Sequence, residues 1–350
     1  MSILAKVCIF CGNKPQDKNM EHVIPQWLIN MTGDKKRLCH LNTISERDIP
    51  FIHFKFPACE ACNSEFSNLE GLVKDTVVKI LNNQSVSANE LSLLLDWFDK
   101  VRIGLWLGIL YLKKQIDEIE PHMHIKTRMG LKDRMLIIER QNHQEQGISF
   151  IGPAQRSFLM NPCAFQLVIN NYIFTNASEY NLLSRRLGMP YCNKVKFYDE
   201  DMVTLDEYQR ATGRIVNPVI KGFSAAPDKT YVFQSCAPAQ TGLFPELYNE
   251  KYVIEHSLDA TNGMGGIFYQ KNTPNALYLP AGSSVNLTPK FMTGTRGDSI
   301  AQVFKLQNHI LDNTYTLKFA TPEIQRKYEE INKYLKSANN NYIKQCSYFK

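Results

Sequence analysis

Residues 58–70 read ACEACNSEFSNLE, with two cysteines separated by two residues and an asparagine directly after the second cysteine. A second pair with the same spacing, CIFC, occupies residues 8–11. Two such pairs are typical of a tetrahedral Zn²⁺ site, because a tight turn presents both thiolates to one ion. We therefore predict one structural zinc with four cysteine ligands: Cys8, Cys11, Cys59 and Cys62. Four sulfurs saturate the ion, so any catalysis must take place elsewhere.

The alternatives to a shared zinc are unpaired core cysteines or two unrelated pairs. The chain of 350 residues has nine cysteines, an odd number that fits a reducing compartment better than a secreted disulfide framework. The best candidate for a membrane span, residues 101–112, is too short to cross a bilayer. The N-terminus has no long apolar segment typical of a secretory signal, so we expect a cytoplasmic protein without a membrane partner.

The net charge of +6 is unevenly distributed. The first 75 residues contain nine Lys or Arg and nine Asp or Glu, so the whole surplus lies in the later residues. If the protein binds nucleic acid, much of the nonspecific attraction is expected from that later region. A surplus of this size also occurs in soluble proteins that have no polyanionic partner.

The sequence pattern changes near residue 87. SANE, residues 87–90, predicts a capping box in which Ser87 is the N-cap and Glu90 reaches back. Apolar residues then continue through residues 91–114, which predicts one long buried helix or a kinked pair. We place a domain boundary near residues 76–86.

Beyond Pro121 the sequence mainly predicts strands, and a helix closes the chain. Asn170 and Asn171 divide residues 165–176 into a predicted hairpin, because asparagine tolerates a positive φ. The other predicted strands are residues 134–140, 195–201, 230–236, 276–280 and 315–319. The closing helix is predicted to have Thr321 as N-cap, Pro322 at its first position and an apolar stripe of Ile324, Tyr328, Ile331 and Leu335. GTRGDS, residues 294–299, is interpreted as a polar loop.

Between the two cysteine pairs lies EHVIPQWL, residues 21–28. Here the sequence resembles the HNH endonucleases, also called ββα-metal nucleases. Many of them frame the catalytic unit with two Cys-x2-Cys pairs, place an acidic residue and a histidine before two apolar residues and a proline, and have asparagine or histidine after the last cysteine. The matching positions are Glu21-His22, Val23-Ile24-Pro25 and Cys62-Asn63. The resemblance covers about residues 5–75 and implies a zinc-clipped ββα-metal module.

The residue types fit the chemistry that the resemblance implies. Hydrolysis of a phosphodiester needs a base for water and a cation for the developing charge. A neutral histidine accepts a proton near pH 7, so His22 is the predicted general base. Glu21 and Asn63 offer hard oxygen ligands that favour a catalytic Mg²⁺ or Mn²⁺ over a second zinc. Glu70, seven residues after Asn63 on the same helical face, is a further ligand or an orienting group.

Neighbouring residues of a regular strand point to opposite faces, so the strand must twist or end if Glu21 and His22 address one phosphate. Asn63 has the alternative role of a helix cap, and Glu70 that of a solvated charge. Asn42 is the candidate for the family's loop-bracing asparagine, and His40 and His53 are alternative helpers. The sequence departs from the family pattern in having Glu21 in place of the commoner Asp, a longer stretch at 32–54, and Phe66 where a lysine is frequent.

Lys35, Lys36 and Arg37 lie in that longer stretch. They could contact DNA phosphates, or form a solvated surface run. The predicted organisation is α+β: an HNH module over residues 1–80 and a larger mixed α+β domain over residues 81–350, which chooses the target, binds a partner or regulates the nuclease.

The predicted activity is metal-dependent hydrolysis of DNA. Its rivals are a non-catalytic zinc module that binds nucleic acid or protein, and an RNA-cleaving toxin. A regulatory protein partner or self-association is also open. A role in bacterial antiviral defence or in a mobile element is an association with HNH fusions in general.

Overall fold

The computed structural model describes residues 7–14, 19–33, 36–39, 49–112, 124–142, 146–198, 203–223, 226–236, 249–259, 264–312 and 316–348. The fold is mixed α+β, as the sequence predicts. The helices are α1 (Gln26–Met31), η2 (Phe51–His53), α2 (Glu60–Leu81), α3 (Ala88–Leu112), α4 (Ile125–Arg128), α5 (Arg156–Met160), α6 (Ser184–Leu187), α7 (Glu250–His256), α8 (Arg296–Leu311) and α9 (Pro322–Cys346).

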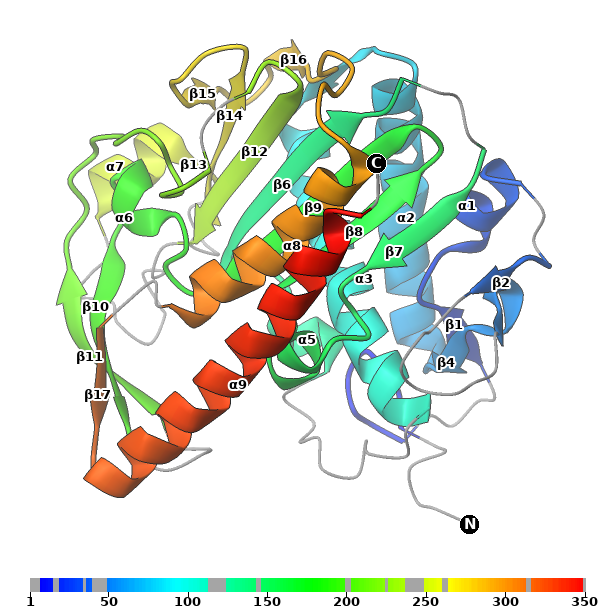
Figure 1. The fold of residues 1–350 in the computed structure, drawn as a ribbon. Coiled ribbons are helices and arrows are strands. Elements are labelled where there is room, and N and C mark those ends of the chain that lie inside the picture. The colour runs from blue at the N-terminus through cyan, green and yellow to red at the C-terminus, as the bar shows by residue number, and fades with distance from the viewer. Residues whose placement is uncertain are drawn as a thin grey trace.

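The main element is an antiparallel sheet of eight strands, ordered β13-β14-β12-β6-β9-β8-β7 with β15 paired to β14 (Figure 1). Its strands are β6 (Asp133–Arg140), β7 (Ile148–Ile151), β8 (Ala164–Ile169), β9 (Tyr172–Glu179), β12 (Lys229–Cys236), β13 (Ser257–Asp259), β14 (Met264–Lys271) and β15 (Leu277–Leu279). The predicted hairpin is confirmed: β8 and β9 are joined at Asn170, which has a φ of 55°. The strands predicted at 134–140, 230–236 and 276–280 are also present.

Both faces of this sheet are covered by apolar side chains. On β6, Leu136 and Ile138 belong to the cluster that contains α3, whereas Met135 and Ile137 belong to a second cluster that includes Leu306 of α8. Burial on both faces explains why this strand is an apolar run without alternation. In Figure 1, α8 crosses one face of the sheet with α9 outside it, while α2 and α3 lie on the other side.

α3 is one continuous helix of 25 residues, so the alternative of a kinked pair is wrong. Its predicted capping box is confirmed: Glu90 Oε2 accepts hydrogen bonds from the Ser87 amide at 2.7 Å and the Ser87 hydroxyl at 2.9 Å. The Glu90 amide donates to Ser87 Oγ at 3.3 Å. Among the described residues, no helix combines the length and the apolarity that crossing a bilayer requires.

The N-terminal segment forms a small ββα arrangement. β1 (Met20–His22) pairs antiparallel with β4 (Lys55–Pro57), and α2 follows β4 after two residues. Between β1 and β4 the chain forms α1, and then the longer stretch at 32–54 contains η2 and a two-stranded pairing of β2 (Leu38–Cys39) with β3 (Ile49–Pro50). His40 and Asn42 lie outside the described residues.

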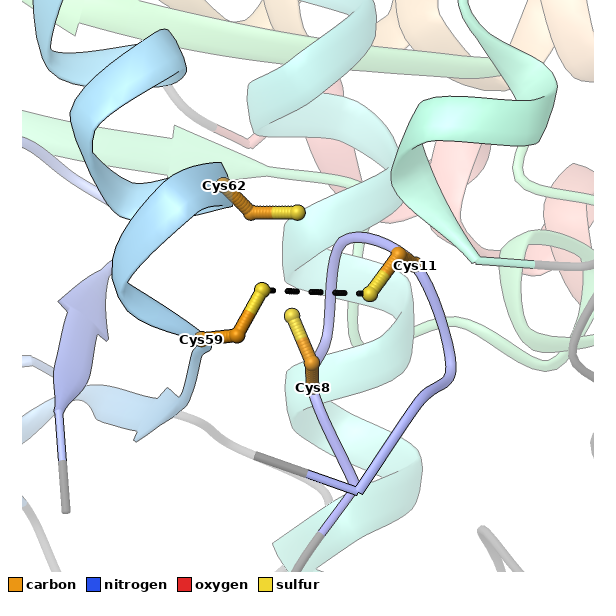
Figure 2. Close-up of side chains that lie close together, drawn as sticks. All are labelled: Cys8, Cys11, Cys59 and Cys62. Atoms are coloured by element: carbon orange, nitrogen blue, oxygen red, sulfur yellow. Dashed lines mark hydrogen bonds between the residues drawn. The ribbon is translucent and has the colours of Figure 1, made fainter. Parts of the chain in front are cut away.

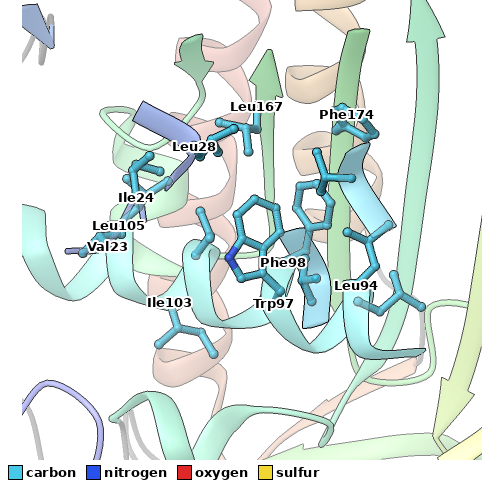
Figure 3. Packing of buried hydrophobic residues seen from close by; sticks show 14 of the residues in the cluster. Val23, Ile24, Leu28, Leu94, Trp97, Phe98, Ile103, Leu105, Leu167 and Phe174 are labelled. Carbon is cyan, nitrogen blue, oxygen red and sulfur yellow. The ribbon is translucent and has the colours of Figure 1, made fainter. Parts of the chain in front are cut away.

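This segment packs on α3 and shares its apolar core. Val23 and Leu28 belong to the same buried cluster as Trp97 of α3 and Phe174 of β9 (Figure 3). Gly108 of α3 allows the close approach, because a Cβ there would stand 2.5 Å from the Phe56 ring. The predicted division near residue 80 stays a prediction, but one core extends across it.

A three-stranded sheet lies at the other end of the molecule, opposite the N-terminal elements in Figure 1. It contains β10 (Tyr191–Phe197), β11 (Val203–Gln209) and β17 (Thr316–Phe319), with β17 parallel to β10. The strand predicted at 195–201 corresponds to β10, which begins four residues earlier, at Tyr191, and ends at Phe197. The remaining short pair is β5 (Ser85–Ser87) with β16 (Ser284–Asn286).

The two helices at the C-terminus correct two predictions. Thr295 is the N-cap of α8 and forms a capping box with Asp298, so residues 294–299 are a helix start and not only a loop. The cap of α9 is confirmed, with Thr321 Oγ1 accepting from the Ile324 amide at 3.2 Å. Ile331, placed in the apolar stripe of α9, is 37% exposed, whereas the buried residues of this helix are Leu335, Asn339 and Cys346.

Candidate metal centre and neighbouring carboxylate cluster

The four predicted cysteines meet at one point (Figure 2). Their Sγ atoms all lie within 4.8 Å of one another, and those of Cys11 and Cys59 are 3.9 Å apart. Zn–S bonds of about 2.3 Å in a tetrahedron place neighbouring sulfurs about 3.8 Å apart, so the cluster fits a structural Zn²⁺. Cys8 and Cys62 are buried and the other two are half-buried, so the centre of the cluster is shielded from solvent.

Local backbone geometry presents each pair of sulfurs. In the first pair the Gly12 amide donates to the Cys8 carbonyl at 2.9 Å, and Gly12 has a φ of 74°, which glycine adopts without strain. In the second pair Cys59 is the N-cap of α2 and Cys62 lies in its first turn. The positive end of the helix dipole stabilises thiolates at that position.

The first cysteine loop is fixed to the ββα arrangement at several points. The Ile9 amide donates to the Pro57 carbonyl at 2.9 Å. Phe10 is fully buried and stacks on Phe66 of α2 with ring centroids 4.1 Å apart. On its other side the loop accepts a hydrogen bond from the Lys126 amide at 2.8 Å, through the Phe10 carbonyl. These contacts fix the first cysteine loop against both α2 and β4.

His22 and Glu21 are neighbours on β1 and engage different partners. Glu21 is 8% exposed, whereas His22 is half-buried, as expected from strand alternation. His22 Nε2 lies 3.0 Å from the Ile52 carbonyl oxygen, and its Nδ1 lies 3.4 Å from Gln26 Nε2. The Ile52 carbonyl can only accept, so Nε2 carries the proton, and Nδ1 of a neutral ring is the basic atom.

The electrostatic environment favours the neutral form of His22. Burial lowers the pKa of His22 below its ordinary value, and the charges of Lys55 and Lys100 act in the same direction. The Ile52 carbonyl and the Glu21 carboxylate oppose this shift but are outweighed. A histidine of this kind is ready to accept a proton at pH 7.

Glu21 and Glu70 converge on Lys100, a residue that the sequence reasoning missed. Lys100 Nζ lies 2.5 Å from Glu21 Oε1 and also contacts Glu70 Oε1. The two carboxylate oxygens therefore share one cation, the Lys100 ammonium, and carboxylate oxygens are also the donor type that a hard divalent ion prefers. Burial raises the pKa of Glu70 to about 7, and the Glu21 charge adds to this rise against the effect of Lys100.

The remaining predicted site residues are placed as follows. Asn63 lies half-buried in the first turn of α2, and its backbone N–H donates a hydrogen bond to the Cys59 carbonyl at 2.9 Å. Its role as a metal ligand stays a prediction. The Arg37 guanidinium donates to the Thr32 carbonyl at 2.8 Å and lies over the Phe51 ring, so it holds the end of α1. Lys36 is exposed, and Lys35 lies outside the described residues.

Comparisons with known proteins assign no family to the chain. No protein-family model matches the chain, and neither the curated proteins nor the solved structures gave a significant match.

Proposed function

We propose that this protein is a metal-dependent endonuclease that hydrolyses DNA phosphodiester bonds at its zinc-clipped N-terminal module. The observation that carries this proposal is the hydrogen bond of His22 Nε2 to the Ile52 carbonyl, which leaves Nδ1 as an unprotonated base. Further support comes from the resemblance to HNH nucleases and from the order of β1, β4 and α2 behind a cluster of four cysteines.

Each residue has a role that follows from its atoms. The Ile52 carbonyl holds the ring in one orientation, and His22 Nδ1 takes a proton from the attacking water once the Gln26 amide, which lies 3.4 Å from the same lone pair, has turned aside. Glu21 and Glu70, with Asn63, are the residues that would hold Mg²⁺ or Mn²⁺. When bound, the ion supplies Lewis-acid stabilisation of the charge on the phosphate and the leaving oxygen. The four cysteines hold β1 and α2 in a fixed relative position.

The rest of the chain fits a role in recognition. The whole positive surplus lies after residue 75, where it adds nonspecific attraction for a polyanion. The same chemistry can hydrolyse RNA, so assays with DNA and RNA substrates must decide which polymer is cut. Target choice, partner binding or regulation by residues 81–350, in a defence system or mobile element, stays part of the proposal.

Cleavage by the full zinc-loaded chain tests the activity. We expect supercoiled plasmid to be nicked or linearised with Mg²⁺ or Mn²⁺ and to stay intact when neither is added. Glu21→Gln should lower the rate at least about tenfold, because a neutral amide holds a divalent ion less strongly. Glu65→Gln is the matched control, since Glu65 is exposed on α2 and pairs with Lys126 at the surface.

Parallel DNA and RNA substrates separate the proposal from its nearest rival. Cleavage of RNA alone would favour the RNA-cleaving toxin. Nucleic-acid binding without cutting in either metal would favour the non-catalytic zinc module.

The cleavage rate should fall in acid. The folded pKa of His22 is lowered, so the imidazole is neutral above its usual value of about 6.5 and becomes protonated, and inactive as a base, only as pH falls below that value. We therefore expect titration of His22 to leave the cleavage rate constant between about pH 7 and 8 and to lower it below about pH 6.5. Initial cleavage rates from acid to neutral pH measure it at a Mn²⁺ concentration that saturates the site, because a bound cation keeps the Glu70 carboxylate ionised. Under that condition an acid limb centred above about 7 would contradict the assignment to His22.

A further inference from the structure

Lys100 is a buried cation enclosed by the candidate metal ligands. It belongs to α3, is 1% exposed, and its Nζ contacts carboxylate oxygens from β1 and from α2. The ammonium also lies 5.8 Å from the centroid of the Phe10 ring, which covers it from the first cysteine loop. β1, α2 and the first cysteine loop thus surround one positive charge that α3 supplies.

Two acidic side chains face one ammonium at this point. One ammonium faces two carboxylates, Glu21 and Glu70, so the cluster carries a net negative charge when both are ionised. Removing two carboxylates and one lysine from water is costly, and apolar residues of similar size stabilise a core equally well. A gain in stability is therefore a weak explanation for this arrangement, whereas two convergent carboxylates are the ligands that a hard cation requires.

We infer that Lys100 occupies the cation position between Glu21 and Glu70, so that a divalent ion binds there only when the ammonium is displaced. This inference rests on the proposed function for the identity of the carboxylates as metal ligands. It assigns Lys100 as a positioning residue that holds both carboxylates together in the metal-free protein and weakens their affinity for the ion.

Geometry makes the two cations mutually exclusive at these oxygens. An ion bound to both Oε1 atoms must lie about 2.0–2.1 Å from each, inside the space that the ammonium nitrogen fills. Two positive charges at contact distance also repel strongly in a desolvated site. The flexible four-carbon stem of lysine provides the rotations through which Nζ can move away.

Calorimetric titration of the zinc-loaded full chain with Mn²⁺ tests the inference. Lys100→Met keeps most of the length of the stem and removes the charge, so it should bind Mn²⁺ about tenfold or more tightly than the wild type. Its melting temperature should also rise with Mn²⁺ at concentrations that leave the wild type unchanged. Lys126→Met, which removes a half-exposed lysine paired with Glu65, is the matched control and should bind like the wild type.

Two further arms locate the effect. Glu21→Gln combined with Lys100→Met should lose the gain in affinity, which places the ion at this carboxylate. A Mn²⁺-soaked crystal of the wild type should show the ion between Glu21 and Glu70 with Lys100 Nζ moved out of contact, and this arm remains decisive if Lys100→Met does not fold.

Unchanged or weaker Mn²⁺ binding in Lys100→Met, or an ion bound while Lys100 keeps both contacts, overturns the inference. Plasmid cleavage measured in parallel separates the two claims. Tighter Mn²⁺ binding without cleavage in any variant supports the inference and contradicts the nuclease. Metal-dependent cleavage with no effect of Lys100→Met on Mn²⁺ binding does the opposite.

Discussion

Replacement of His22 by alanine is expected to lower the rate of DNA cleavage by about 10²–10⁴-fold, the usual contribution of a general base. The side chain is half-buried at the edge of β1, and its hydrogen bonds are to the Ile52 carbonyl and Gln26, so its removal opens little of the core. The fold should therefore survive while the acceptor at Nδ1 is lost. Single-turnover cleavage of plasmid, with circular dichroism as the check on folding, measures this.

Chemical rescue sharpens that experiment. Free imidazole added to His22→Ala should restore part of the rate, because the vacated space lies beside the point where water would be deprotonated; a purely structural histidine would give no such recovery. His309→Ala removes a histidine from α8, at a site that the mechanism does not use, and should cut like the wild type. Equal cleavage by wild type and His22→Ala would remove His22 from the mechanism, and a loss with His53→Ala instead would assign the role to that residue.

Loss of the zinc is expected to have the largest effect on stability. A bound zinc would join segments that are far apart in sequence, such as Cys11 and Cys59, which are separated by 48 positions. The first segment also carries the buried Phe10, and Cys59 is the N-cap of α2, so loss of the ion would free a core residue and a helix start together. Cys62→Ser should therefore release the zinc and lower the free energy of unfolding by about 4 kcal/mol or more. Native mass spectrometry gives the zinc content, and chemical denaturation followed by circular dichroism gives the stability.

A cysteine outside the cluster provides the control. Cys346 is buried near the end of α9, so Cys346→Ala should keep one zinc per chain and cost no more than an ordinary small core substitution. A wild-type protein that binds no zinc under reducing conditions, or a Cys62→Ser variant of unchanged stability, would contradict the structural role. Zinc loss should also abolish cleavage, because β1 and α2 would no longer be held in a fixed relative position.

Several features of the fold can be predicted because they depend on neighbours in sequence. The capping box of α3, the proline start of α9, the Asn170 turn and the Cys-x2-Cys loops are decided by hydrogen bonds and φ values within a few residues. The start of α8 carries the same kind of signal, Thr295 followed three residues later by Asp298, but the glycines around it indicate a turn and hide the cap.

Burial pattern is less reliable where tertiary contacts decide it. Ile331 fits the spacing of an apolar stripe, yet it is exposed because α9 contacts the rest of the molecule with only part of its length. The predicted division near residue 80 follows a change of composition, which does not reveal that Val23 and Trp97 pack in one cluster.

Spacing along the chain was enough to predict the residue types of the candidate site: four sulfurs that fit a zinc, and a histidine beside an acidic residue between the two cysteine pairs. The partners that these groups contact could be found only from the packing of the elements. Lys100 lies in the middle of an apolar helix 79 residues from Glu21, and its periodicity carries no sign of the two carboxylates. The physical reason is that a buried charge is tolerated only through specific partners, and those partners are brought together by packing between elements rather than by spacing along the chain.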